Sequence, residues 1–108
     1  MEKVNIEAVT PEERGKIAKQ TVSLENVTIS RITASPGARW SIDVKPYAGT
    51  NSCELWHTGI MVSGVLAVRM DDGKEQHLGK NDVFVVPPGH DAWCVGEEAA
   101  VFVEFSKR

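Results

Sequence analysis

Residues 79–93 constrain this chain most, because they join a turn, a short apolar strand and a rigid corner. Val83–Val86 consists of β-branched and aromatic residues, which favour strands. Pro87-Pro88-Gly89 follows and must bend the backbone, since proline fixes φ and glycine tolerates positive φ. The stretch therefore predicts a β structure in which His90 lies directly after a sharp corner.

The rest of the chain repeats short apolar runs separated by turn residues, as in antiparallel sheets. Asp71-Asp72-Gly73 predicts a tight hairpin, because the centre of such a turn needs positive φ. One short helix is expected over residues 10–17, where Thr10 can cap and Pro11 suits the first helical position. This spacing predicts an all-β, antiparallel sandwich or barrel with that N-terminal helix at most. The expected strands are Val22–Leu24, Val27–Ile32, Trp40–Val44, Cys53–Val62, Val65–Met70, Gln76–Leu78, Val83–Val86, Trp93–Val95 and Ala99–Phe105.

Length and charge restrict the classes of function. We expect the 108 residues to form one domain, residues 1–108, with a barrel core over about residues 35–105. The net charge is −3 and no basic run is present, so nucleic acid is not an expected partner. No apolar segment is long enough to span a membrane, and the start of the chain lacks the pattern of a secretory signal. We therefore expect a cytoplasmic protein with reduced cysteines.

Strand alternation places several possible ligands on one face. Alternate side chains of a strand share a face, so Cys53, His57 and Met61 fall together. After the corner, His90 and Cys94 share a face in the same way. If both faces point inward, the two cysteines and the two histidines converge. The other interpretation is that the histidines only form hydrogen bonds in a polar cavity and that Cys53 is a buried thiol.

These motifs resemble those of the cupins, which are small antiparallel β-barrels whose mouth often holds a metal. The first cupin motif is His-x-His, then three or four residues, Glu, six residues and Gly. Aligning Gly64 with the final glycine places His57 at the glutamate position. Cys53 and Asn51 then stand where the family has its two histidines. Both of the usual histidines are therefore replaced.

The second cupin motif is matched by Gly79, Pro87 and Gly89, but its histidine position holds Ala92. His90 precedes that position by two residues, which is one strand period, so it still faces the cavity. The resemblance covers roughly residues 35–105 and implies an all-β fold, an antiparallel, jelly-roll-like β-barrel of the cupin type. The segments Ser-Cys-Glu-Leu-Trp-His and Pro-Pro-Gly-His-Asp-Ala-Trp are also similar to those of small stand-alone bacterial cupins.

The resemblance and the ligand types imply a metal on His57 and His90, with Cys53 as the third member. Two imidazoles with a thiolate or water suit zinc, iron, copper or nickel. Asn51, Met61, Cys94 and Arg39 are the expected ligand-pocket residues. The first functional hypothesis is a metal-dependent oxidoreductase or isomerase acting on a small organic molecule. The alternative is a non-catalytic, metal-free cupin that binds a small ligand or serves as a sensor.

Apolar side chains on the opposite strand faces indicate self-association. Trp56, Ile60 and Val62 fall on the face away from the expected ligands, and so does Trp93. Apolar patches that would otherwise meet water usually mark contact with another element or subunit. We therefore expect a homodimer, with no membrane partner.

Overall fold

The computed structural model describes residues 1–107 and places most of them in antiparallel strands. The prediction of an all-β, antiparallel fold is confirmed. The strands are β1 (Glu12–Arg14), β2 (Ile17–Ser23), β3 (Val27–Ala34), β4 (His57–Ser63), β5 (Val65–Met70), β6 (Glu75–Leu78), β7 (Val83–Val86), β8 (His90–Val95) and β9 (Ala100–Lys107). The helices are a 3₁₀ turn, η1 (Ile6–Ala8), and two short α-helices, α1 (Trp40–Asp43) and α2 (Lys45–Ala48).

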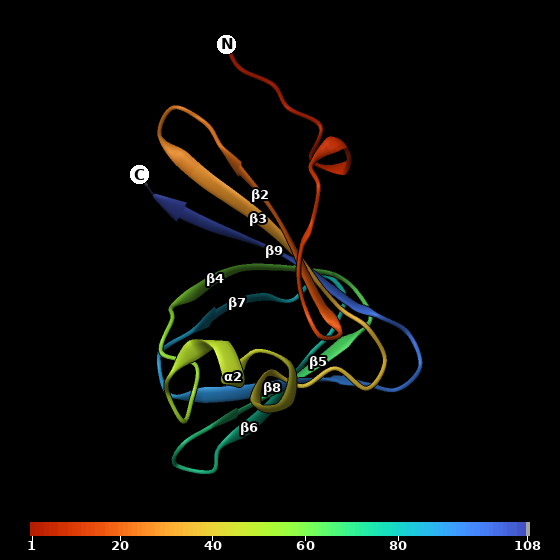
Figure 1. Cartoon of the computed structure of the whole chain (residues 1–108), viewed down its shortest axis with the longest axis vertical. Coiled ribbons are helices and arrows are strands. Elements are labelled where there is room, and N and C mark those ends of the chain that lie inside the picture. Colours follow the sequence, from red (N-terminus) through yellow and green to blue (C-terminus); the bar gives the residue numbers. More distant parts are fainter. Residues whose placement is uncertain (108) are drawn as a thin grey trace.

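The strands form two facing sheets (Figure 1). The larger sheet has the order β1-β2-β3-β9-β4-β7, and the smaller sheet has the order β6-β5-β8. The sheets do not close into a hydrogen-bonded barrel. β2, β3 and β9 extend beyond the body, so the tip of the β2–β3 hairpin and the end of β9 lie together at one end of a molecule 43 Å long (Figure 1). Among residues 1–107, no helix combines the length and apolar character that crossing a bilayer requires.

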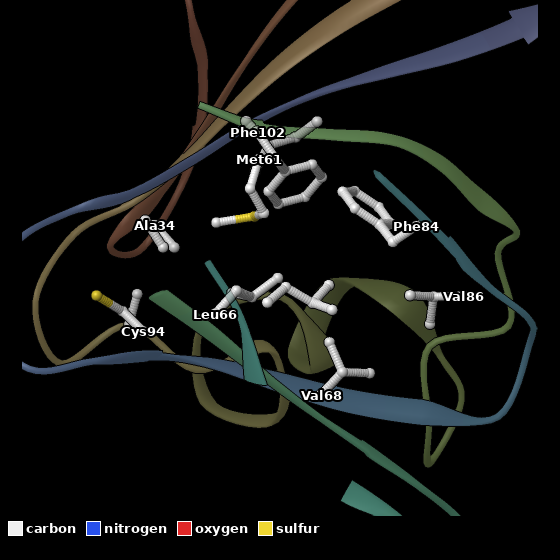
Figure 2. Packing of buried hydrophobic residues seen from close by; sticks show 12 residues of the cluster. Ala34, Met61, Leu66, Val68, Phe84, Val86, Cys94 and Phe102 are labelled. Atoms are coloured by element: carbon white, nitrogen blue, oxygen red, sulfur yellow. The ribbon is translucent and has the colours of Figure 1, made fainter. Parts of the chain in front are cut away.

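The core lies between the two sheets (Figure 2). Met61, Phe84 and Phe102 from the larger sheet face Leu66 and Val68 from the smaller one (Figure 2). Burial of such side chains stabilises the fold by about 1.5–3 kcal/mol each. β4 follows the predicted alternation, because Gly59 and Met61 are buried whereas Thr58 and Val62 are exposed.

The buried core begins earlier in the sequence than the expected barrel core over residues 35–105. Ile32 and Ala34 of β3 belong to the buried cluster, and Ile17 of β2 packs against it. These strands join the larger sheet through β9, since Ile32 pairs with Phe102. The core therefore includes the two strands that precede residue 35.

The predicted helix over residues 10–17 is wrong. Glu12–Arg14 forms β1 and turns at Gly15 into β2, with Arg14 paired to Ile17. Gly15 has a φ of +55°, and a Cβ there would meet the Asp43 side chain. A helix of about two turns is marginal in water, whereas the hairpin extends a sheet and half-buries Ile17.

Two predicted strands also differ from the structure. Trp40–Val44 was predicted as a strand but is largely helical, because Asp91 of β8 accepts the backbone N–H of Ser41 at 3.0 Å. Asp43 similarly accepts the backbone N–H of Arg39 at 2.8 Å. The predicted strand Cys53–Val62 begins only at His57, and the preceding residues form a loop in which Trp56 is exposed. By contrast, the hairpin at Asp71-Asp72-Gly73 is confirmed between β5 and β6.

Candidate metal centre

Cys53 lies in the loop before β4, and its backbone is fixed to the start of β8. Its N–H donates to the carbonyl oxygen of His90 at 2.8 Å, and its own carbonyl accepts the N–H of Gly89 at 2.8 Å. Gly89 has a φ of +92°, a conformation that side chains disfavour. The Pro-Pro-Gly corner therefore holds the buried Cys53 thiol beside His90.

His57 is the first residue of β4, and Glu104 of β9 orients its ring. The two strands are neighbours in the larger sheet. Nδ1 of His57 donates to Oε2 of Glu104 at 2.5 Å. Nε2 of His57 lies 3.5 Å from Sγ of Cys53. The carboxylate thus turns the other ring nitrogen toward the thiol.

His90 is the first residue of β8, and the corner before it fixes its ring. Nδ1 of His90 donates to the carbonyl oxygen of Pro87 at 2.8 Å. A carbonyl only accepts, so Nδ1 carries a proton and Nε2 is the ring nitrogen left to interact with Cys53. His90 is 3 % exposed, and its ring centroid lies 5.2 Å from that of His57.

The three side chains converge on one point. One ligand atom from each of Cys53, His57 and His90 lies within 4.8 Å of the other two. In both histidines Nδ1 is hydrogen-bonded to an acceptor, the arrangement that fixes metal-ligating imidazoles. A thiolate with two imidazoles suits zinc, iron, copper or nickel better than magnesium or calcium. The donor set therefore fits the metals named from the sequence.

The charges of Cys53 and His57 depend on each other. Burial acts to raise the pKa of the Cys53 thiol, but hydrogen bonds with His57 and His90 outweigh it and lower the pKa to about 6. Burial acts to lower the pKa of His57, but hydrogen bonds with Cys53 and Glu104 outweigh it and raise the pKa to about 9. Without metal, the pair is therefore a thiolate beside an imidazolium at neutral pH.

A mostly apolar cavity of about 160 Å³ adjoins these side chains. Cys53, His57 and His90 line it, together with the ionisable residues Lys19 and Glu104. The remaining lining residues are Ile17, Ile32, Ala34, Ala38, Trp40, Val44, Leu55, Leu66, Val68, Leu78, Phe84, Val86, Ala92, Trp93 and Phe102. Few polar groups in an apolar cleft are typical of sites for small organic ligands.

A second, larger hollow of about 480 Å³ lies beside β6 and β7. It shares four apolar residues with the smaller cavity, but none of the three possible metal ligands lines it. Of the two cavities, only the smaller one is therefore lined by the possible metal ligands.

The four residues expected to line the ligand pocket lie elsewhere. Asn51 is exposed on the loop before Cys53, and Met61 is packed in the core at 1 % exposure. Cys94 donates its thiol proton to the Glu98 carbonyl oxygen at 3.2 Å instead of joining the cluster. Arg39 donates to Asp91 at 2.8 Å and does not line the cavity.

Trp93 also lies differently from the sequence-based expectation. The sequence predicts Trp93 on the outer face of its strand, but Trp93 is among the residues that line the cavity. The Arg39 guanidinium covers the ring at 4.5 Å from the centroid. α1 packs against β8, and Arg39 also pairs with Trp93 through an isolated β-bridge.

Sequence reasoning missed Lys19 and Glu104. Glu104 follows Ala100 and Phe102 at two-residue intervals, so it shares their inward face of β9. A carboxylate on the inward side of an apolar strand was the signal that could have revealed it. Lys19 shares the cavity face of β2 with Ile17, but that segment was divided between a predicted helix and a later strand.

Comparison with solved structures identifies the fold. The polyketide cyclase RemF from Streptomyces resistomycificus matches with a TM-score of 0.73 and 14 % identity, over 99 % of this chain and 79 % of that one. A cupin-superfamily sugar phosphate isomerase from Silicibacter pomeroyi matches with a TM-score of 0.72 and 15 % identity, over 99 % and 76 %. An RmlC-like cupin from Shewanella frigidimarina matches with a TM-score of 0.65 and 20 % identity, over 94 % and 85 %.

These likenesses define an antiparallel double-sheet protein of the jelly-roll class. Within that class, the chain has the cupin fold. No model of a protein family matches the sequence, and no curated protein does either.

Proposed function

We propose that this chain is a small cupin that binds a divalent metal through Cys53, His57 and His90 and takes a small organic ligand in the adjoining cavity. The observation that carries the proposal is the pairing of both Nδ1 atoms with outer acceptors, Glu104 and the Pro87 carbonyl. With each Nδ1 engaged, Nε2 is the nitrogen left for the cluster, and Nε2 of His57 lies 3.5 Å from the Cys53 sulfur. Three protein ligands with an open position are typical of catalytic metal sites.

The activity that this site supports is a metal-dependent isomerase or oxidoreductase reaction on a small oxygen-containing molecule. A bound divalent metal would supply Lewis-acid polarisation of a carbonyl or hydroxyl oxygen. Glu104 holds the Nδ1 proton of His57 and keeps that ring oriented. The apolar walls exclude water around the ligand, which strengthens electrostatic interactions there. One structural neighbour is itself named as a sugar phosphate isomerase, which supports the isomerase alternative.

A metal-free, ligand-binding or sensor cupin is the second candidate. One observation favours it, namely that Cys53, His57 and Glu104 already form a hydrogen-bonded chain without metal. No buried side-chain nitrogen or oxygen among residues 1–107 lacks a hydrogen-bond partner. The polar groups of the site are therefore satisfied without an ion.

Metal analysis separates the two candidates. Protein purified without added metal, and again after incubation with zinc, iron, copper or nickel salts, should retain one ion per chain. His57→Ala and His90→Ala should each abolish this uptake, whereas His77→Ala, an exposed histidine on β6, should not. Negligible metal in the wild type after every incubation would contradict the metalloprotein and favour the sensor.

A further inference from the structure

The cavity carries one lysine, and its place near the opening indicates the charge of the ligand. Lys19 of β2 is the only lysine or arginine among the described residues that line the cavity. Its side chain is 45 % exposed, so the ammonium group lies where the cavity meets solvent. Its Nζ is 3.7 Å from Oε1 of Glu104.

The pairing of Lys19 with Glu104 is loose. An ammonium group has three donors, yet within residues 1–107 Lys19 has only this contact, which is longer than a hydrogen bond. Such half-exposed ion pairs contribute little stability. Glu104 uses its other carboxylate oxygen for His57. Lys19 therefore keeps donors available for a molecule that enters the cavity.

The charge balance of the occupied site also favours an anion. With the divalent metal of the proposed function, Cys53 and Glu104 each contribute one negative charge and Lys19 contributes one positive charge. Neutral imidazoles leave the site with a net positive charge. An apolar cavity with this charge attracts a ligand that carries one negative charge.

We infer that the ligand is a small apolar monoanion, such as a single-ring carboxylic acid, whose anionic group pairs with Lys19. The inference rests on the proposed function, because the net charge includes the metal. The size of the cavity, about 160 Å³, is comparable to that of an apolar cavity of about 150 Å³ that accepts benzene. The ring lies against the apolar walls, and Lys19 selects for the charge.

The experiment compares benzoate with benzamide, which has the same ring and a similar shape but no charge. Both are titrated calorimetrically into zinc-loaded wild type, Lys19→Met and Lys19→Arg, after the zinc content of each has been measured. The wild type should bind benzoate about tenfold more tightly than benzamide. Lys19→Met should lose that preference through weaker benzoate binding, and Lys19→Arg should retain it.

Two outcomes overturn the inference while leaving the proposed function intact. One is a zinc-loaded wild type that fails to bind benzoate, or binds it no better than benzamide. The other is an unchanged benzoate affinity in Lys19→Met with full zinc content. A wild type that takes up no zinc instead contradicts the proposed function, and that result is seen before any ligand is added.

Discussion

Glu104 and His57 are 47 residues apart in the sequence, yet they share a hydrogen bond on the cavity side of the larger sheet. The pairing of β4 with β9 places them close together. Glu104 thereby fixes which nitrogen of His57 faces Cys53 and His90. The order of strands in the sheet therefore determines the orientation of a possible metal ligand.

Replacing Glu104 by Gln should weaken metal binding. The amide keeps the size of the side chain but removes the charge that orients His57, so zinc affinity should fall about 10–100-fold. Competition with a chromogenic chelator measures the affinity. Glu97→Gln, on an exposed turn, is the matched control and should bind zinc like the wild type. If the two variants bound zinc with equal affinity, the proposed role of Glu104 in orienting His57 would be contradicted.

Replacing Gly89 by Ala should destabilise the fold. Its φ of +92° is strained for a side chain, and a Cβ there would lie 3.0 Å from Oδ2 of Asp71. We expect the free energy of unfolding to fall by about 1–3 kcal/mol. Gly79→Ala is the control, because Gly79 has no positive φ and its Cβ would meet only Asp82 Oδ2 at 3.9 Å. Urea denaturation that ranks the two variants equally would contradict this account of the corner.

Replacing Asp91 by Asn should loosen α1. Asp91 accepts hydrogen bonds from Arg39 Nε, the Ser41 N–H and the Ser41 hydroxyl. The NH₂ group of asparagine cannot accept these hydrogen bonds and would face other donors. We therefore expect the free energy of unfolding to fall by about 1–3 kcal/mol. Asp72→Asn, in the exposed β5–β6 hairpin, preserves a turn that asparagine also favours. Thermal melting of the two variants should therefore differ, with Asp91→Asn melting lower.

Self-association remains a prediction, and Ile60 and Val62 keep their place in it. β4 and β7 present Ile60 and Val62 beside Val83 and Val85, and Val83 is 78 % exposed. Trp93 does not belong to this face, because it lies on β8 of the smaller sheet. Val83→Glu should abolish a dimer in sedimentation velocity while leaving the circular-dichroism spectrum unchanged. Arg69→Glu, which is exposed on β5 of the smaller sheet, should have no effect. A monomeric wild type at high micromolar concentration would contradict the prediction.

Local chemistry made much of the fold predictable. Val65–Met70 and Val83–Val86 are strands with the predicted bounds, since β-branched runs between turn residues leave few alternatives. Asp71-Asp72-Gly73 forms its hairpin for the same local reason. Strand alternation also predicted that Cys53 and His57 share a side. Cys53 instead lies in the loop before β4, and its backbone hydrogen bonds to Gly89 and His90 place it beside His57.

The tertiary structure decided what depends on neighbours distant in sequence. Trp40–Asp43 is a helix because Asp91 accepts a backbone N–H that its own sequence leaves without a partner. Lys19 and Glu104 line the cavity because β2 and β9 are two strands apart in one sheet, an order that periodicity alone cannot reveal. Sequence alternation gives the side of a strand that a residue occupies. Only sheet order and packing determine which residues meet there.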